Sequence, residues 1–159
     1  MKVIIAGSRG WHPPKSDIAK VMLYLNWEVD EVVCGMAPGA DMAGKAWADS
    51  VEISVLEMPA DWNKLKKRAG KIRNHAMALY ADAAVVFWDG DSPGSANMVA
   101  HMNVLGKKVE VITPDKLEGI ARWLASPGLE QEAPEDDELV EEAEEGEIEG
   151  DELVEGDAW

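Results

Sequence analysis

The chain has 159 residues, 47% of them apolar, which fits one folded domain. Its formal net charge is −16, and the excess of acids lies at the C-terminal end. Residues 1–129 hold all 15 Lys and Arg together with 15 acids, whereas residues 130–159 hold the other 16 acids and no base. We therefore expect a domain at 1–129 without net charge, followed by an acidic tail at 130–159 that is extended or disordered.

The same features exclude several classes of protein. No stretch reaches the roughly 18 apolar residues of a membrane span, and the first residues lack the pattern of a secretory signal. The one cysteine, Cys34, excludes an intrachain disulfide and lies in an apolar run, where we expect it to be buried. The sequence thus predicts a soluble cytoplasmic protein, and its motifs indicate no metal site and no cofactor.

Short runs rich in Val and Ile recur along the chain and predict five strands, at 2–6, 31–34, 53–58, 83–88 and 108–113. Continuous apolar runs are typical of strands that are buried on both faces of a parallel sheet. Segments with helical spacing lie between and after them, at 16–25, 40–50, 64–80, 95–105 and 115–124. This alternation predicts an α/β fold, with a doubly wound, mostly parallel five-stranded sheet and helices on both faces.

Ligands of such sheets bind outside the carboxyl ends of the strands, so the loops there are candidate site loops. The first reads AGSRG at 6–10. Gly7 lets the backbone approach a ligand, Ser8 offers a hydroxyl and Arg9 offers a guanidinium suited to phosphate. The alternative is a plain turn with a surface arginine. Neither a GxGxxG fingerprint nor a P-loop motif is present.

The second candidate loop reads CGMAPGAD at 34–41. Gly35 and Gly39 precede a helix whose first N–H groups can bind an anion. We expect Asp41 to cap this helix or, alternatively, to accept hydrogen bonds from ribose hydroxyls. Gly44 lies inside the helix, where it costs about 1 kcal/mol relative to Ala, so we expect close packing there.

The third candidate loop reads FWDGDSPGS at 87–95. Gly90 and Gly94 give it conformational freedom, and Ser92 and Ser95 supply hydroxyls at the start of a helix that can face a phosphate. Asp89 and its neighbour Asp91 repel phosphate unless they hold sugar hydroxyls or a cation. The loop therefore favours a nucleotide over inorganic phosphate.

The segment 64–73 is the chain's one basic cluster, and such runs are usually solvated helix faces. Its last residue, Arg73, is followed by Asn74 and Met77, where the chain turns apolar, and we expect these three residues to face the site. Further apolar residues of the predicted helix at 64–80 are Ile72, Ala76, Leu79 and Tyr80, which we expect on its apolar face.

Together these pieces resemble the SLOG superfamily, named after the Smf/DprA and Lonely Guy proteins, and within it the small YspA-like branch. The matching stretches are AGSRG, CGMAPGAD, PADW at 59–62, IRNHAM at 72–77 and FWDGDSPGS. The resemblance implies a Rossmann-like fold that binds nucleotides or nucleotide-derived ligands such as AMP, ADP-ribose or NAD. It also implies that the chain forms a homodimer, because dimers are common in this superfamily.

The Lonely Guy relatives are phosphoribohydrolases that use an Arg and a Glu. The resemblance makes Arg73 the matching arginine and the candidate catalytic residue. The Glu position falls near Asn97, which cannot transfer a proton as a carboxylate does. Met36 stands where a second glycine is common in the branch. The sequence thus predicts nucleotide binding and leaves weak N-glycosidic hydrolysis open.

The acidic tail suggests an alternative function. It repeats Asp-Glu-Leu-Val-Glu at 137–141 and 151–155 and ends on Trp159, and it resembles the aromatic-ended tails of single-stranded-DNA-binding proteins. The chain would then be an interaction protein whose tail docks on a basic partner surface or mimics nucleic acid. A plain solubility tail is the simpler reading. A neutral domain with an acidic tail argues against direct binding of nucleic acid.

Overall fold

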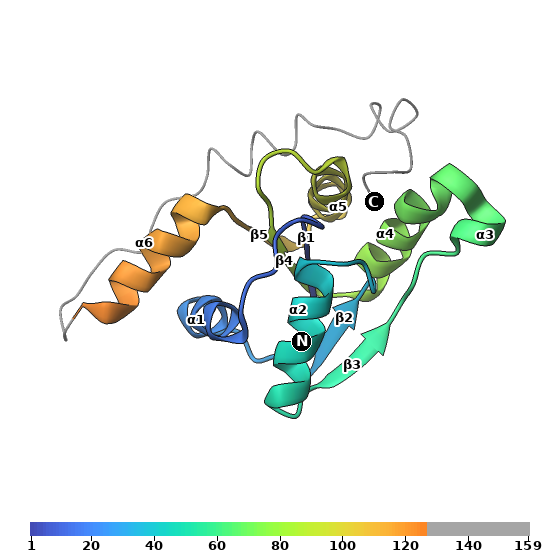
Figure 1. Cartoon of the computed structure of the whole chain (residues 1–159). Coiled ribbons are helices and arrows are strands. Elements are labelled where there is room, and N and C mark those ends of the chain that lie inside the picture. The colour runs from blue at the N-terminus through green and yellow to red at the C-terminus, as the bar shows by residue number, and fades with distance from the viewer. Residues whose placement is uncertain (127–159) are drawn as a thin grey trace.

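The structure is a computed structural model that describes residues 1–126, and the predicted tail lies outside these residues. Strands and helices alternate as expected (Figure 1). The strands are β1 (Lys2–Gly7), β2 (Glu31–Cys34), β3 (Ser54–Glu57), β4 (Ala83–Phe87) and β5 (Lys108–Ile112). The helices are α1 (Lys15–Leu25), α2 (Ala40–Ser50), α3 (Trp62–Leu65), the 3-10 turn η1 (Lys66–Arg68), α4 (Ala69–Tyr80), α5 (Pro93–Val104) and α6 (Pro114–Ala125).

The five strands form one sheet in the order β3-β2-β1-β4-β5, and every neighbouring pair is parallel. The order reverses between β1 and β4, since the chain leaves β1 towards β2 and leaves β4 towards β5. This confirms the predicted Rossmann-like, doubly wound α/β fold. The loops after β1 and β4 leave the sheet side by side, because Gly7 pairs with Phe87 at the ends of the two strands.

Two apolar clusters hold the helices on opposite faces of the sheet. On one face, Val3 and Ile5 of β1 belong to a buried cluster with residues of α1, α2 and α6. On the other face, Ile4 of β1 belongs to a cluster with residues of α4 and α5, including Met77 and Met98. Among the described residues, no helix is long and apolar enough to cross a membrane.

The predicted helix at 64–80 is wrong in two respects. The segment breaks into α3, η1 and α4, because Lys66 has a left-handed backbone conformation with φ of 55° that a continuous helix cannot contain. The apolar face of α4 also differs, since Ile72 and Leu79 are 44% and 55% exposed. The helix instead buries its Arg73 side, together with Asn74, Met77 and Ala78. Packing of polar groups at the sheet edge thus overrides the apolar spacing.

Gly44 packs as expected. A Cβ atom at this position would lie 2.5 Å from Cγ2 and 2.7 Å from Cβ of Ile5, a fully buried residue of β1. The glycine therefore lets α2 approach the sheet closely.

We predict that Gly44→Ala lowers the free energy of unfolding by about 1–2 kcal/mol, because overpacking against Ile5 costs about 3 kcal/mol at this close approach and the gain in helix propensity returns about 1 kcal/mol. Urea denaturation of the purified protein measures the change. Gly10→Ala is the control: a Cβ there meets nothing within 4 Å, so its stability should stay close to that of the wild type. Equal stability of the Gly44→Ala variant would contradict the close packing.

Candidate functional site

The loops after β1 and β4 are tied to each other. Ser8 donates its backbone N–H to the carbonyl of Phe87 at 2.9 Å, and its hydroxyl accepts from the backbone N–H of Asp89 at 3.1 Å. Ser8 is buried, and its hydroxyl helps to tie the two loops together. The two loops form one structural unit at the carboxyl edge of the sheet.

The loop between β2 and α2 packs directly on this unit. Gly39 has a φ of 84°, and a Cβ atom there would lie 2.5 Å from the backbone oxygens of both Ser8 and Arg9. Any side chain would therefore force the loops apart, in addition to the strain of a left-handed conformation. Gly39 thus acts by allowing the two loops to meet.

Arg73 of α4 links this unit to the helices. It is buried, donates from Nη1 to the carbonyl of Gly35, and donates from Nε to Oδ1 of Asn74 at 3.0 Å. Asn74 in turn donates to the carbonyl of Gly94 and to Oδ1 of Asn97, each at 3.2 Å. Through these contacts Arg73 and Asn74 connect the β2–α2 loop with the start of α5.

These elements enclose a small cavity of about 30 Å³ at the carboxyl edge, on the face that α4 and α5 cover. This volume is far below that of a typical small-molecule site, which is about 300–1,000 Å³. The predicted site residues that line it are Gly7, Arg9, Asp41, Arg73, Asn74, Ser92, Gly94 and Ser95. Ala6, Ala37 and Met98 also line the cavity, and nothing in their spacing distinguishes them in the sequence from loop and core positions.

Other predicted site residues lie elsewhere. Ser8, Gly35 and Gly39 are buried behind the cavity wall. Gly90 is exposed, and Asp89 lines a second cavity on the opposite face of the sheet. The predicted cap role of Asp41 is wrong: the N-cap of α2 is Gly39, and Oδ2 of Asp41 accepts instead from the backbone N–H of Ala37 at 3.2 Å.

The wall of the cavity carries opposing charges. Burial raises the pKa of Asp41 to about 6, and the charge of Arg73 and the bond from Ala37 act against this rise. Burial lowers the pKa of Arg9 and of Arg73, which still remain cationic at neutral pH. The buried carboxyl group of Asp41 thus lies near the guanidinium groups of Arg9 and Arg73. An anion that binds to the two guanidinium groups is repelled less by Asp41 when its carboxyl group is protonated.

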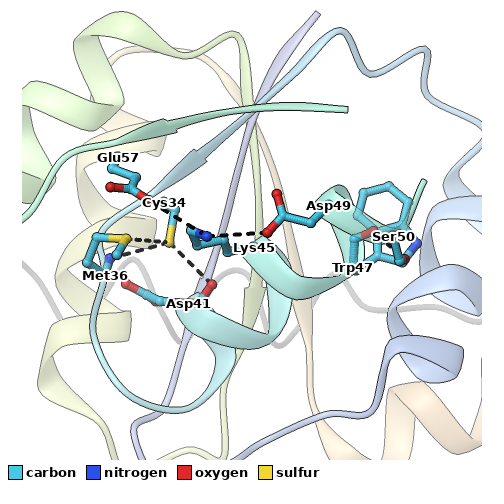
Figure 2. A network of polar contacts seen from close by, with 8 residues as sticks. All are labelled: Cys34, Met36, Asp41, Lys45, Trp47, Asp49, Ser50 and Glu57. Carbon is cyan, nitrogen blue, oxygen red and sulfur yellow. Dashed lines mark hydrogen bonds and ion pairs between the residues drawn. The ribbon is translucent and has the colours of Figure 1, made fainter. Parts of the chain in front are cut away.

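Behind the cavity, a polar network holds the β2–α2 loop (Figure 2). The thiol of Cys34 lies 3.4 Å from the carbonyl oxygen of Asp41, to which it donates, and it accepts from the N–H of Met36. Cys34 is fully buried, as expected, and burial raises its pKa to about 11, so it is no thiolate nucleophile. Lys45 lies 3.3 Å from Asp49 and 3.8 Å from Glu57, which joins α2 to β3.

Met36 occupies a backbone position that suits glycine. Its φ of 65° is left-handed, which is unusual for a residue with a side chain. Having methionine here, where glycine is common in the YspA-like branch, therefore strains the backbone. The Met36 side chain contacts Cys34, with the two sulfur atoms 3.6 Å apart.

The Arg9 side chain extends over the indole of Trp62, with its Cζ 5.8 Å from the ring centroid. Its Nε is buried and has no hydrogen-bond partner among the described residues. An acceptor that enters the cavity would satisfy this donor. Within residues 1–126, no group of three or more His, Cys, Asp or Glu is placed to hold a metal ion.

The fold is that of a doubly wound α/β protein, and a cavity lined by two arginines lies where the strand order reverses. Residues 1–65, from β1 to α3, match the model of the YspA, cpYpsA-related SLOG family. This match confirms the predicted resemblance to the SLOG superfamily and its YspA-like branch over the first 65 residues. The comparisons found no matching curated protein and no matching solved structure.

We predict that ionisation of Asp41 destabilises the fold. Because its folded pKa of about 6 lies above the usual value, the folded state holds a proton that the unfolded state releases between about pH 4 and 6. The free energy of unfolding of the wild type, relative to Asp41→Asn, should fall by about 2 kcal/mol as pH rises from 4.5 to 7.5. Urea denaturation of both proteins across this range measures it. If the stability of the wild type relative to Asp41→Asn rises with pH instead, the charge of Arg73 lowers the pKa of Asp41 by more than burial raises it.

Proposed function

We propose that the protein binds a nucleotide or a nucleotide-derived ligand, of the kind of AMP, ADP-ribose or NAD, with one phosphate at the cavity between Arg9 and Arg73. The observation that carries the proposal is the convergence of two guanidinium groups on a cavity at the reversal point of the sheet. Membership of the SLOG family supports a nucleotide-related ligand.

The start of α5 supports the placement of the phosphate. Ser92 caps this helix by accepting from the N–H of Ser95 at 3.3 Å, and Pro93 occupies its first turn. Ser92, Gly94 and Ser95 all line the cavity, so the positive end of the helix dipole points to the same place as the two arginines. Three sources of positive potential therefore favour one anionic group.

The size of the cavity limits what enters it. About 30 Å³ accommodates a phosphoryl oxygen or two, whereas a nucleoside needs several hundred Å³. The phosphate would thus be anchored here, and the rest of the ligand would lie outside this cavity.

SLOG membership also suggests phosphoribohydrolase activity, for which Arg73 is the candidate catalytic residue. Asn97, at the position of the relatives' Glu, is buried and accepts a hydrogen bond from Asn74. An amide in this place holds the loops together but transfers no proton, so any release of base from AMP should be slow. Nucleotide binding is therefore the function that we propose, and hydrolysis is at most a slow additional activity.

We predict that Arg9→Ala weakens the binding of ADP-ribose about 10- to 100-fold, because a hydrogen bond to a charged group contributes about 1.5–3 kcal/mol. Isothermal titration calorimetry measures the affinity. Lys108→Ala is the matched control: it also removes a cation that lies over an indole, 5.6 Å from the Trp27 ring, but at the opposite end of the sheet. Unchanged affinity in Arg9→Ala would remove the proposed phosphate contact.

The acidic tail supports a second candidate function, docking on a basic partner protein. Its 16 acids without a base, its two Leu-Val pairs and Trp159 combine charge with apolar anchors. A neutral domain would then present the tail to the partner.

We predict that deletion of residues 130–159 abolishes capture of such a partner and that Trp159→Ala weakens it, because the aromatic anchor is lost. Affinity capture with the full chain, the truncated chain and the Trp159→Ala variant, read by quantitative mass spectrometry, tests this. A partner that the truncated chain retains binds the domain and not the tail.

A further inference from the structure

We propose that the second cavity, which lies between the β1–α1 loop and α6, receives the nucleoside part of the ligand whose phosphate lies between Arg9 and Arg73. This inference rests on the proposed function and specifies how the ligand crosses the sheet edge. The cavity has a volume of about 510 Å³, which falls in the usual range of small-molecule sites.

The two cavities adjoin each other across the same two loops. In the β1–α1 loop, Arg9 lines the first cavity and the next residues, Gly10 and Trp11, line the second. In the β4–α5 loop, Asp89 lines the second cavity and Ser92 the first. Arg9 and Gly10 are consecutive, so their Cα atoms are only about 3.8 Å apart. A ligand that passes over the β1–α1 loop at this point therefore reaches both cavities.

Gly10 leaves this passage open. A Cβ atom at Gly10 would meet nothing within 4 Å, and the residue itself is exposed. The backbone between Arg9 and Trp11 therefore presents a bare surface to a ligand. This differs from Gly7 and Gly39, whose missing side chains are needed for the packing of the protein itself.

The second cavity has the opposite electrostatic character to the first. Its charged lining groups are three carboxylates, Asp17, Asp89 and Glu118, which accept hydrogen bonds and repel an anion. The charged groups of the first cavity are two guanidinium groups and the carboxyl of Asp41, so cations are in excess there. The two cavities therefore match a ligand with a phosphate at one end and several O–H and N–H donors at the other. A nucleotide whose base carries an amino group is such a ligand, because its ribose and base supply these donors.

Apolar walls complete the match to a base. Trp11, Leu117 and Ala121 line the cavity together with Pro114. The Trp11 ring packs edge to face against Phe87, with centroids 5.6 Å apart and an interplanar angle of 88°, which orients the indole. Asp17 and Glu118 also pair with Lys20 and Arg122 on their own helices. Exposed pairs of this kind are weak, so both carboxylates can still accept from a ligand.

The arrangement explains the acidic residue at the end of β4. Asp89 would repel a phosphate if it lay beside the arginines, but it points to the cavity on the other face of the sheet. Its backbone N–H donates to the Ser8 hydroxyl, and its Oδ1 accepts from the backbone N–H of Asp91 at 3.0 Å, which together hold the carboxylate at the boundary between the two halves of the ligand. There it would accept from the ribose hydroxyls.

The test fills the second cavity and leaves the first unchanged. Ala121→Trp places an indole in the cavity, and Ala125→Trp is the matched control, since Ala125 is exposed on the same helix and lies outside the lining. Calorimetry compares the affinities of AMP and ribose 5-phosphate in the two variants and the wild type. Glu118→Gln is a second variant, which removes one carboxylate without adding bulk.

We expect Ala121→Trp to reduce AMP affinity at least about tenfold and ribose 5-phosphate affinity much less, so that the preference for AMP disappears. Glu118→Gln should lower AMP affinity about threefold or more, and Ala125→Trp should bind as the wild type does. If Ala121→Trp retains full AMP affinity while Arg9→Ala loses it, the inference is overturned and the proposed function stands. If the wild type binds neither ligand nor ADP-ribose, both are overturned.

Discussion

The contacts of one buried arginine, Arg73, hold the carboxyl edge of the sheet together. A guanidinium group in a protein interior loses its hydration, and this loss must be offset by acceptors and opposite charge. The carbonyl of Gly35 and the amide of Asn74 supply acceptors, and the charge of Asp41 favours the cation. A Cβ atom at Gly35 would lie 2.7 Å from both Arg73 and Asp41, so the missing side chain is what allows this arrangement.

The loops around this arginine depend on it and on each other. Asn74 extends the contacts to Gly94 and Asn97 at the start of α5, while Gly39 lets the β2–α2 loop meet the loop after β1. Because each loop follows a different strand, the strand order brings them to one edge and the buried polar contacts set their spacing. Two cavities then lie on the two faces of the sheet, one on each side of the joined loops: the first has an excess of cations, and the second is lined by carboxylates.

Much of the architecture could be predicted from local sequence. The five strands, the parallel sheet and the close packing of Gly44 on Ile5 follow from apolar runs and from the cost of glycine in a helix. The helix at 64–80 could not be predicted correctly in this way. The apolar spacing suggested that Ile72 and Leu79 are buried, but both are exposed. The face that carries Arg73, which was expected to face the site, is buried instead, because the contacts of this side chain with distant loops decide the orientation of α4.

The sequence by itself determined the alternation of strands and helices, the position of the candidate site loops after the strands and the separation of charge between the domain and the tail. These features depend on residues that are close in the chain. The tertiary structure alone decided which loop residues meet. Arg73 reaches the carbonyl of Gly35, 38 residues away, whereas Asp89 and Ser92 lie close in the chain but line different cavities. These contacts depend on the order of the strands and on the side of the sheet on which each helix packs. The spacing of residues along the chain encodes neither of these two features.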